Sequence, residues 1–186
     1  FIDSMTEMRN LNRYECLKSL AQIPGVYIPS LYEPKYNFEG KLLDIEPKED
    51  TIPRKISKQT WRGNSLTHSR VITPNAAWPN IHMIEVVRSC PELCRFCLAS
   101  YLTLPFRSSS IEDGLIPAIE KGLSATNRIG LLGASVTQHP QFEELLNWLS
   151  QTRFDDIHLS VSSVRAATVN SKMTNLLKRR GCKSLT

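Results

Sequence analysis

Short apolar runs and amphipathic segments alternate along the second half of this chain. The strand-like runs are residues 81–88, 129–134 and 157–161. The segments with apolar residues at helical spacing are residues 110–122, 141–149 and 169–180. Strands that alternate with helices favour parallel pairing and right-handed crossovers, so the pattern predicts the α/β class. The run at 129–134 is continuously apolar, as in strands buried on both faces, and residues 183–186 are expected to begin a fourth strand.

The first 79 residues lack this regular alternation and predict a helix followed by an irregular linker with short β segments. Ser4 to Glu7 has the form of a capping box, and the apolar spacing predicts one helix over residues 5–21, ended by Pro24-Gly25. The extended segments that prolines separate are residues 26–28, 41–45 and 54–57. We therefore expect one region over residues 1–79 and a second over residues 80–186.

Composition and charge are those of an ordinary globular chain, with 41% hydrophobic and 22% charged residues. No apolar run is long enough to cross a bilayer and no export signal is present, so we predict a cytoplasmic protein with no membrane partner. The net charge of +5 is scattered, and its densest group, residues 178–180, stands at an expected helix end. The sequence thus gives little support for nucleic-acid binding. The chain does not begin with Met, and we expect it to belong to a longer polypeptide whose remainder is a partner.

Three of the five cysteines, Cys90, Cys94 and Cys97, form the pattern C-x3-C-x2-C. Thiolates this close on one loop can converge on a single metal centre, because the chain closes around it at little entropic cost. Structural zinc usually takes four ligands, whereas three cysteines on a 4Fe–4S cluster leave one iron free to bind another molecule. The spacing therefore favours an iron–sulfur site, with zinc second. Disulfides are disfavoured, because the cysteine count is odd and neighbours this close seldom pair.

The cysteine loop resembles that of the radical S-adenosylmethionine (SAM) superfamily. Those enzymes carry C-x3-C-x-aromatic-C after the first strand of a partial (β/α) barrel, and Cys90, Cys94, Phe96 and Cys97 match this motif position by position. The resemblance implies that residues 80–186 form the first half of such a barrel, with parallel strands, truncated before the remaining ones.

The surrounding sequence is similar to the subgroup in which a cobalamin-binding domain precedes the barrel. The similar segments are residues 23–30, 85–88 and 95–100. The resemblance implies cobalamin in a domain outside this chain, and an electron donor such as a flavodoxin or ferredoxin. It does not identify the substrate.

In this family, the three cysteines bind three irons of a 4Fe–4S cluster and SAM chelates the fourth. Reductive cleavage of SAM gives a 5′-deoxyadenosyl radical that abstracts hydrogen from the substrate. By the same resemblance, the ring of Phe96 shields the cluster while its backbone faces the adenine of SAM. Gly133, Ala134 and Ser135 stand where the family usually has a Gly-Gly-Glu stretch that binds the SAM amino group, although the glutamate is absent here.

Ser162 and Arg165, at the end of the third strand, complete the candidate pocket. Arg165 either meets a carboxylate of SAM or substrate, or forms a structural salt bridge. The loops that follow the three strands are expected at one edge of the sheet, since ligands gather at the carboxyl ends of parallel strands.

Two other classes of protein stay open from the residues alone. A zinc-stabilised module that binds nucleic acid or protein would need a fourth ligand, for which Cys182 and His82 are candidates. A non-catalytic iron–sulfur electron carrier would usually have a fourth cysteine near the other three, and none lies there.

Overall fold

The computed structural model describes residues 1–185 and divides the chain into two compact units, Phe1–Trp61 and Arg62–Thr186. The boundary lies earlier than the expected one between residues 79 and 80. Backbone hydrogen bonds explain the difference. The Ser69 N–H donates to the Met83 carbonyl at 2.8 Å, and the Glu85 N–H donates to the Thr67 carbonyl at 2.8 Å. The segment before residue 80 is therefore an edge of the second unit's sheet.

The first unit contains two short helices and a β-hairpin. Its elements are α1 (Ile2–Glu7), α2 (Arg13–Ala21), the 3₁₀ helix Pro29–Leu31, β1 (Tyr32–Tyr36) and β2 (Leu42–Pro47). The single helix expected over residues 5–21 is wrong, because the Asn12 side chain caps a new helix by accepting from the Glu15 N–H at 3.0 Å. The strands pair antiparallel, and the expected extended segments 26–28 and 54–57 are not strands.

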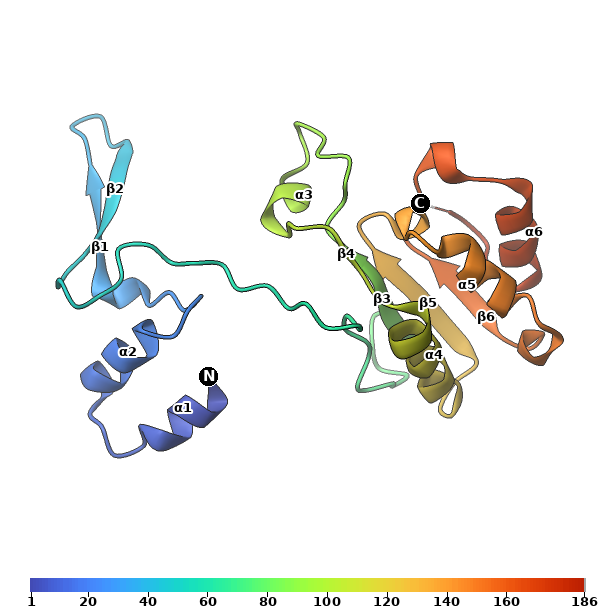
Figure 1. Ribbon diagram of the computed structural model, residues 1–186, viewed down its shortest axis with the longest axis horizontal. Coiled ribbons are helices and arrows are strands. Elements are labelled where there is room, and N and C mark those ends of the chain that lie inside the picture. The colour runs from blue at the N-terminus through green and yellow to red at the C-terminus, as the bar shows by residue number, and fades with distance from the viewer. Residues whose placement is uncertain (186) are drawn as a thin grey trace. The chain divides into compact units, whose positions relative to one another are not determined.

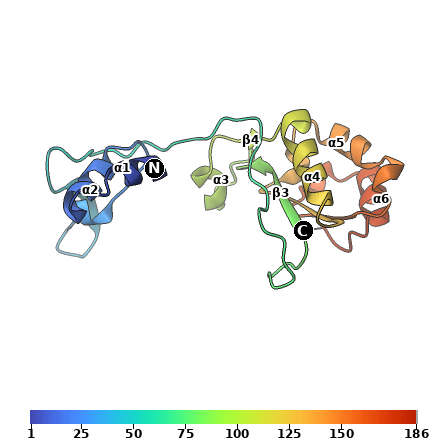
Figure 2. The same ribbon diagram turned by 90° about the horizontal axis from the view of Figure 1, so that it is seen from below.

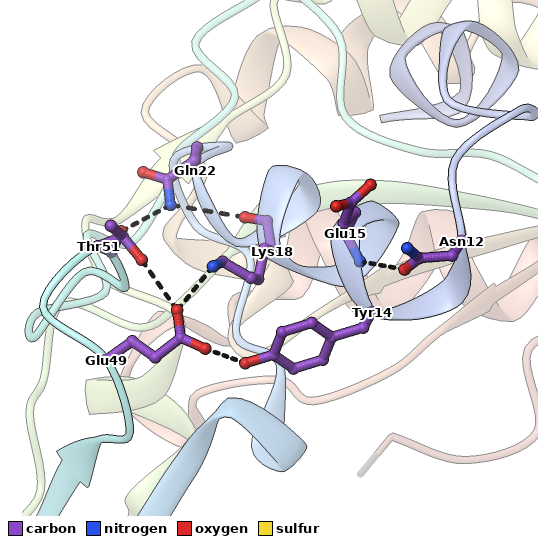
Figure 3. A network of polar contacts seen from close by, with 7 residues as sticks. All are labelled: Asn12, Tyr14, Glu15, Lys18, Gln22, Glu49 and Thr51. Atoms are coloured by element: carbon purple, nitrogen blue, oxygen red, sulfur yellow. Dashed lines mark hydrogen bonds and ion pairs between the residues drawn. The ribbon is translucent and has the colours of Figure 1, made fainter.

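A cluster of polar contacts joins α2 to the chain after β2 (Figure 3). Glu49 accepts hydrogen bonds from the Tyr14 hydroxyl, from Lys18 Nζ at 2.6 Å and from Thr51 Oγ1 at 3.4 Å. Gln22 Nε2 donates to the Thr51 carbonyl at 2.9 Å. A small core of Ala21, Leu31, Tyr32 and Ile52 lies in the same unit. These contacts make residues 1–61 a compact unit instead of an irregular linker.

The second unit is a mixed α/β unit with an open four-stranded sheet in the order β4-β3-β5-β6 (Figure 1). Its strands are β3 (His82–Arg88), β4 (Arg107–Ser108), β5 (Arg128–Gly133) and β6 (His158–Val161). Its helices are α3 (Leu98–Leu102), the π-helical turn Ile111–Leu115, α4 (Ile116–Leu123), α5 (Phe142–Leu149) and α6 (Ser171–Arg179). The predicted parallel pairing is confirmed for β3 with β5 and for β5 with β6. The short antiparallel strand β4 was not predicted.

One face of this sheet packs against helices and the other does not. Side chains alternate between the two faces of a strand, and the buried positions Ile84, Leu131 and Leu159 share one core cluster with residues of α4, α5 and α6. On the opposite face Leu132 is partly exposed and Ser160 is exposed. The expectation that residues 129–134 are buried on both faces is therefore wrong.

The ends of the elements follow local sequence signals. Ser110 accepts from the Asp113 N–H at 3.2 Å and opens the π-helical turn before α4, as the sequence indicates. Asn170 caps α6 by accepting from the Met173 N–H at 2.9 Å. Residues 183–185 form no strand, and Thr186, the last residue of that expected strand, lies outside the described residues. No helix within residues 1–185 combines the length and apolarity that crossing a membrane requires.

Candidate metal centre at the carboxyl edge of the sheet

The cysteine loop leaves the sheet through a strained turn at the end of β3. Ser89 has a left-handed backbone with φ of 70°, and its buried hydroxyl donates to the Ser100 carbonyl at 2.8 Å. Leu93, inside the loop, also has a positive φ of 47°. Backbone conformations of this kind are uncommon for side-chain-bearing residues and persist where the surroundings hold them. The loop and its helix α3 project beyond the end of β3 in both views (Figures 1 and 2).

The three cysteines of the loop differ in environment. Cys90 and Cys97 are half-buried and Cys94 is exposed. The Ser100 hydroxyl donates to Cys97 Sγ at 3.3 Å, and with the backbone N–H groups of Ser100 and Ala99 it lowers the pKa of the Cys97 thiol. Burial raises the pKa of the Cys90 thiol, and the neighbouring Cys97 raises it further. The shifts have opposite directions, so Cys97 is the more acidic of these two thiols.

The cysteine loop offers three thiols as candidate metal ligands. Three thiols lie on one short loop, and the Cys97 N–H donates to the Cys94 carbonyl at 2.9 Å, so the last two share a turn. Within residues 1–185, no three His, Cys, Asp or Glu side chains are grouped closely enough to hold a metal ion. Three thiols fit either an iron–sulfur cluster or zinc with a fourth ligand from elsewhere.

The loops after the three parallel strands meet at one edge of the sheet, as the topology predicts. From the loop after β5, Gln138 Nε2 donates to Glu92 of the cysteine loop at 2.6 Å, and the Cys90 thiol donates to Gln138 Oε1 at 3.6 Å. From the loop after β6, the Arg165 guanidinium forms an ion pair with Glu92. The Arg165 N–H also donates to Thr137 Oγ1 at 3.2 Å.

The residues expected to bind SAM lie at this edge, but several have structural roles. A Cβ on Gly133 would lie 2.5 Å from Val87 Cγ2, so this glycine allows β5 to approach β3 closely. Ser135 is buried and Ala134 is exposed. The Ser162 hydroxyl and backbone N–H both donate to the Leu131 carbonyl, at 3.3 and 3.1 Å, which extends the pairing of β6 with β5.

Phe96 and Arg165 of the candidate site differ in their contacts with the rest of the chain. Phe96 is 90% exposed and projects from the loop with little cover from the rest of the chain. Arg165 forms the salt bridge that was one of its two predicted roles, and its partner is Glu92. The side chain of Arg165 is still 41% exposed, which leaves it accessible to a bound anion.

Sequence reasoning missed Glu92, Thr137 and Gln138, which connect the three loops, and Ser100, which donates to Cys97 beside the cysteine loop. A signal existed for Glu92, since an acidic residue between two cysteines that are candidate thiolate ligands adds repulsion unless a cation offsets it. No pattern marked Gln138, because its contact with Cys90 depends on how the loop after β5 folds back over the edge.

The two candidates for a fourth zinc ligand lie away from the cysteine loop. His82 begins β3, whereas Cys90 follows the end of that strand. Cys182 packs against the core near His158, the first residue of β6, and its thiol donates to the Ser184 carbonyl at 3.2 Å. Because β3 and β6 run parallel, both candidates lie at the amino edge of the sheet. The structure thus gives no support to closed zinc coordination by these residues.

The fold and the site define a mixed α/β protein whose parallel sheet carries a cysteine-rich loop at its carboxyl edge. The chain is similar to an uncharacterized protein of Methanocaldococcus jannaschii, with 34% identity over 158 residues. The match covers 84% of this chain and 31% of that relative, so the chain spans about a third of the relative's length. No family model matches the sequence, and no solved structure matches it.

Proposed function

We propose that this chain is part of a radical SAM enzyme and that its cysteine loop holds the 4Fe–4S cluster. The observation that carries the proposal is the position of the C-x3-C-x2-C loop, which follows β3 and contacts the loops after β5 and β6. Ligand sites of parallel sheets form at this edge. The open sheet with helices on one face is consistent with part of a (β/α) barrel.

Each residue of the edge would have a distinct task. Cys90, Cys94 and Cys97 would hold three irons. When bound, the cluster would supply the electron that cleaves SAM. The Ser100 hydroxyl would donate to the Cys97 sulfur, and Arg165 would be available to a carboxylate.

Exposed apolar side chains on and beside the loop would exclude water from bound SAM and substrate. They are Leu93, Phe96, Leu98, Tyr101 and Leu102. A reduced flavodoxin or ferredoxin would deliver the electron. Cobalamin would require a domain outside this chain, and the greater length of the Methanocaldococcus relative leaves room for further domains in that protein.

Anaerobic reconstitution with iron and sulfide tests the proposal. The wild-type protein should gain the visible absorption of a 4Fe–4S cluster, and its reduced form should give an electron paramagnetic resonance signal that changes when SAM is added. Cys94→Ala should lose the cluster, whereas Cys16→Ala, which alters a cysteine of α2, should keep it. A wild type that takes up zinc and no cluster would contradict the proposal.

A further inference from the structure

Gln138 connects the first cysteine of the loop to an ion pair. It ends a 3₁₀ helix, Val136–Gln138, directly after β5. Its amide lies between two groups of the cysteine loop, with Oε1 3.6 Å from Cys90 Sγ and Nε2 2.6 Å from a Glu92 oxygen. The same Glu92 oxygen pairs with Arg165. One neutral side chain therefore contacts a thiol at one end and a carboxylate at the other.

This arrangement suits a metal-free loop only. A thiol can donate to the amide oxygen, and the amide nitrogen then serves the carboxylate. A sulfur bound to metal is a thiolate with no proton to donate, so the amide oxygen beside it has no donor and is repelled. The side chain has one nitrogen, which cannot face the sulfur and Glu92 from opposite ends at once. Metal on Cys90 and the hydrogen bond to Glu92 therefore compete for the same N–H group.

We propose that Gln138 is a positioning residue for the metal-bound Cys90 sulfur, an inference that rests on the proposed metal centre. With metal on the loop, the amide turns its N–H to the sulfur and releases Glu92. The Glu92 carboxylate then keeps its ion pair with Arg165 and loses its hydrogen bond from Gln138. Metal binding to the cysteine loop thereby changes the contacts between this loop and the loops after β5 and β6. Outer hydrogen bonds of this kind orient metal ligands, and their removal typically weakens metal binding by about 10- to 100-fold.

The proposal and a simple charge effect of Glu92 predict opposite changes in metal affinity when Glu92 is replaced. If Glu92 competes with the sulfur for the amide, Glu92→Leu removes the acceptor, frees the amide and strengthens metal binding. If Glu92 acts only through its negative charge, its loss weakens the binding of a divalent cation. A charge effect would also persist without Gln138, whereas competition would vanish with it. A double-mutant cycle separates the two.

Anaerobic titration with Co²⁺ supplies the measurement, because sulfur-to-cobalt charge-transfer absorption reports thiolate binding without any enzymatic assay. Gln138→Leu should weaken Co²⁺ binding about 10-fold. Glu92→Leu should strengthen it in the wild type and leave it unchanged in Gln138→Leu. Gln141→Leu is the matched control, because that amide pairs with Glu144 at 2.9 Å and should not affect the affinity. If Gln138→Leu fails to fold by circular dichroism, Gln138→Met replaces it.

The outcomes distinguish this inference from the proposed function. Equal effects of Glu92→Leu in both backgrounds, or an unchanged affinity in Gln138→Leu, would overturn the role of Gln138 alone. A second outcome combines the expected Co²⁺ affinities of the double-mutant cycle with a reconstituted cluster whose electron paramagnetic resonance signal does not change with SAM. That outcome would contradict the proposed enzyme class but support the role of Gln138. A wild type without sulfur-to-cobalt absorption would contradict the role of Gln138 but not the proposed function, which the reconstitution with iron and sulfide tests separately.

Discussion

Replacing Gly133 by alanine should destabilise the second unit, because the added methyl group has no space. An ideal Cβ at this position lies 2.5 Å from Val87 Cγ2, about 0.9 Å closer than ordinary contact, and 2.8 Å from the Val87 carbonyl oxygen. Val87 is fully buried in the core, so its side chain cannot swing into solvent. The carbonyl belongs to β3, and moving it separates β3 from β5. Overpacking of this kind costs about 1–3 kcal/mol, and we expect the upper half of that range.

The expected loss of about 2–3 kcal/mol corresponds to a roughly 30- to 150-fold change in the unfolding equilibrium. Urea unfolding followed by Trp148 fluorescence measures it, since Trp148 packs against the core 4.5 Å from Phe154 between ring centroids. The exposed neighbour provides a control, because Ala134→Ser should change stability by no more than about 0.5 kcal/mol.

A second substitution examines the cause of the loss. Combining Gly133→Ala with Val87→Ala should cost less than the sum of the single changes, because the shortest contact disappears. If Gly133→Ala is as stable as the wild type, the close approach of the two strands is not what requires glycine. Its presence would then need an explanation from ligand binding.

Two further predictions concern buried charged and titratable groups in the same unit. Arg180→Met should cost about 2–4 kcal/mol in urea unfolding, because it leaves the buried carbonyl of Leu149 and the partly buried carbonyl of Gln151 without their donor. The exposed neighbour change Arg179→Met should be neutral. Burial lowers the pKa of both His82 and His139, so the unfolded chain takes up protons first as pH falls below about 6.5, and stability should decline there. His82→Leu should reduce this decline between pH 7.5 and 5.5, with His139 responsible for the rest; an unchanged slope would show that His82 is not the cause.

The parallel sheet could be predicted because each strand has its own local signal. The apolar residues of β3, β5 and β6 are needed to bury the face beneath the helices, so the pattern survives in the sequence. The amphipathic segments mark α5 and α6 for the same reason. Parallel strands then place their following loops at one edge, which is why the meeting of these loops could be anticipated without coordinates. The partner of Arg165, Glu92, could not be anticipated in this way.

The parts that sequence reasoning missed depend on non-local pairing. Strand β4 has only two residues and pairs with β3 without a periodic pattern of its own. Residues 67–69 are held to β3 by backbone hydrogen bonds, which do not depend on the identity of the side chains. The break between α1 and α2 had a local signal in Asn12, whose capping role competes with helix continuation. Apolar spacing outweighed that signal in the prediction of one helix.

At the carboxyl edge, the loops after β5 and β6 form a base to which the projecting cysteine loop is attached. This arrangement bears on how a metal would bind. The loops after β5 and β6 hold each other, since the Val136 N–H donates to the Ser163 carbonyl at 3.1 Å and Arg165 bonds Thr137 through its backbone. The cysteine loop is tied to this base by the side-chain contacts of Glu92, and Cys94 stays exposed. In the proposed metal centre, free energy released by three metal–sulfur bonds would gather the cysteines without unfolding the sheet. The fold would then set the place and direction of the loop, and the metal would set its final geometry.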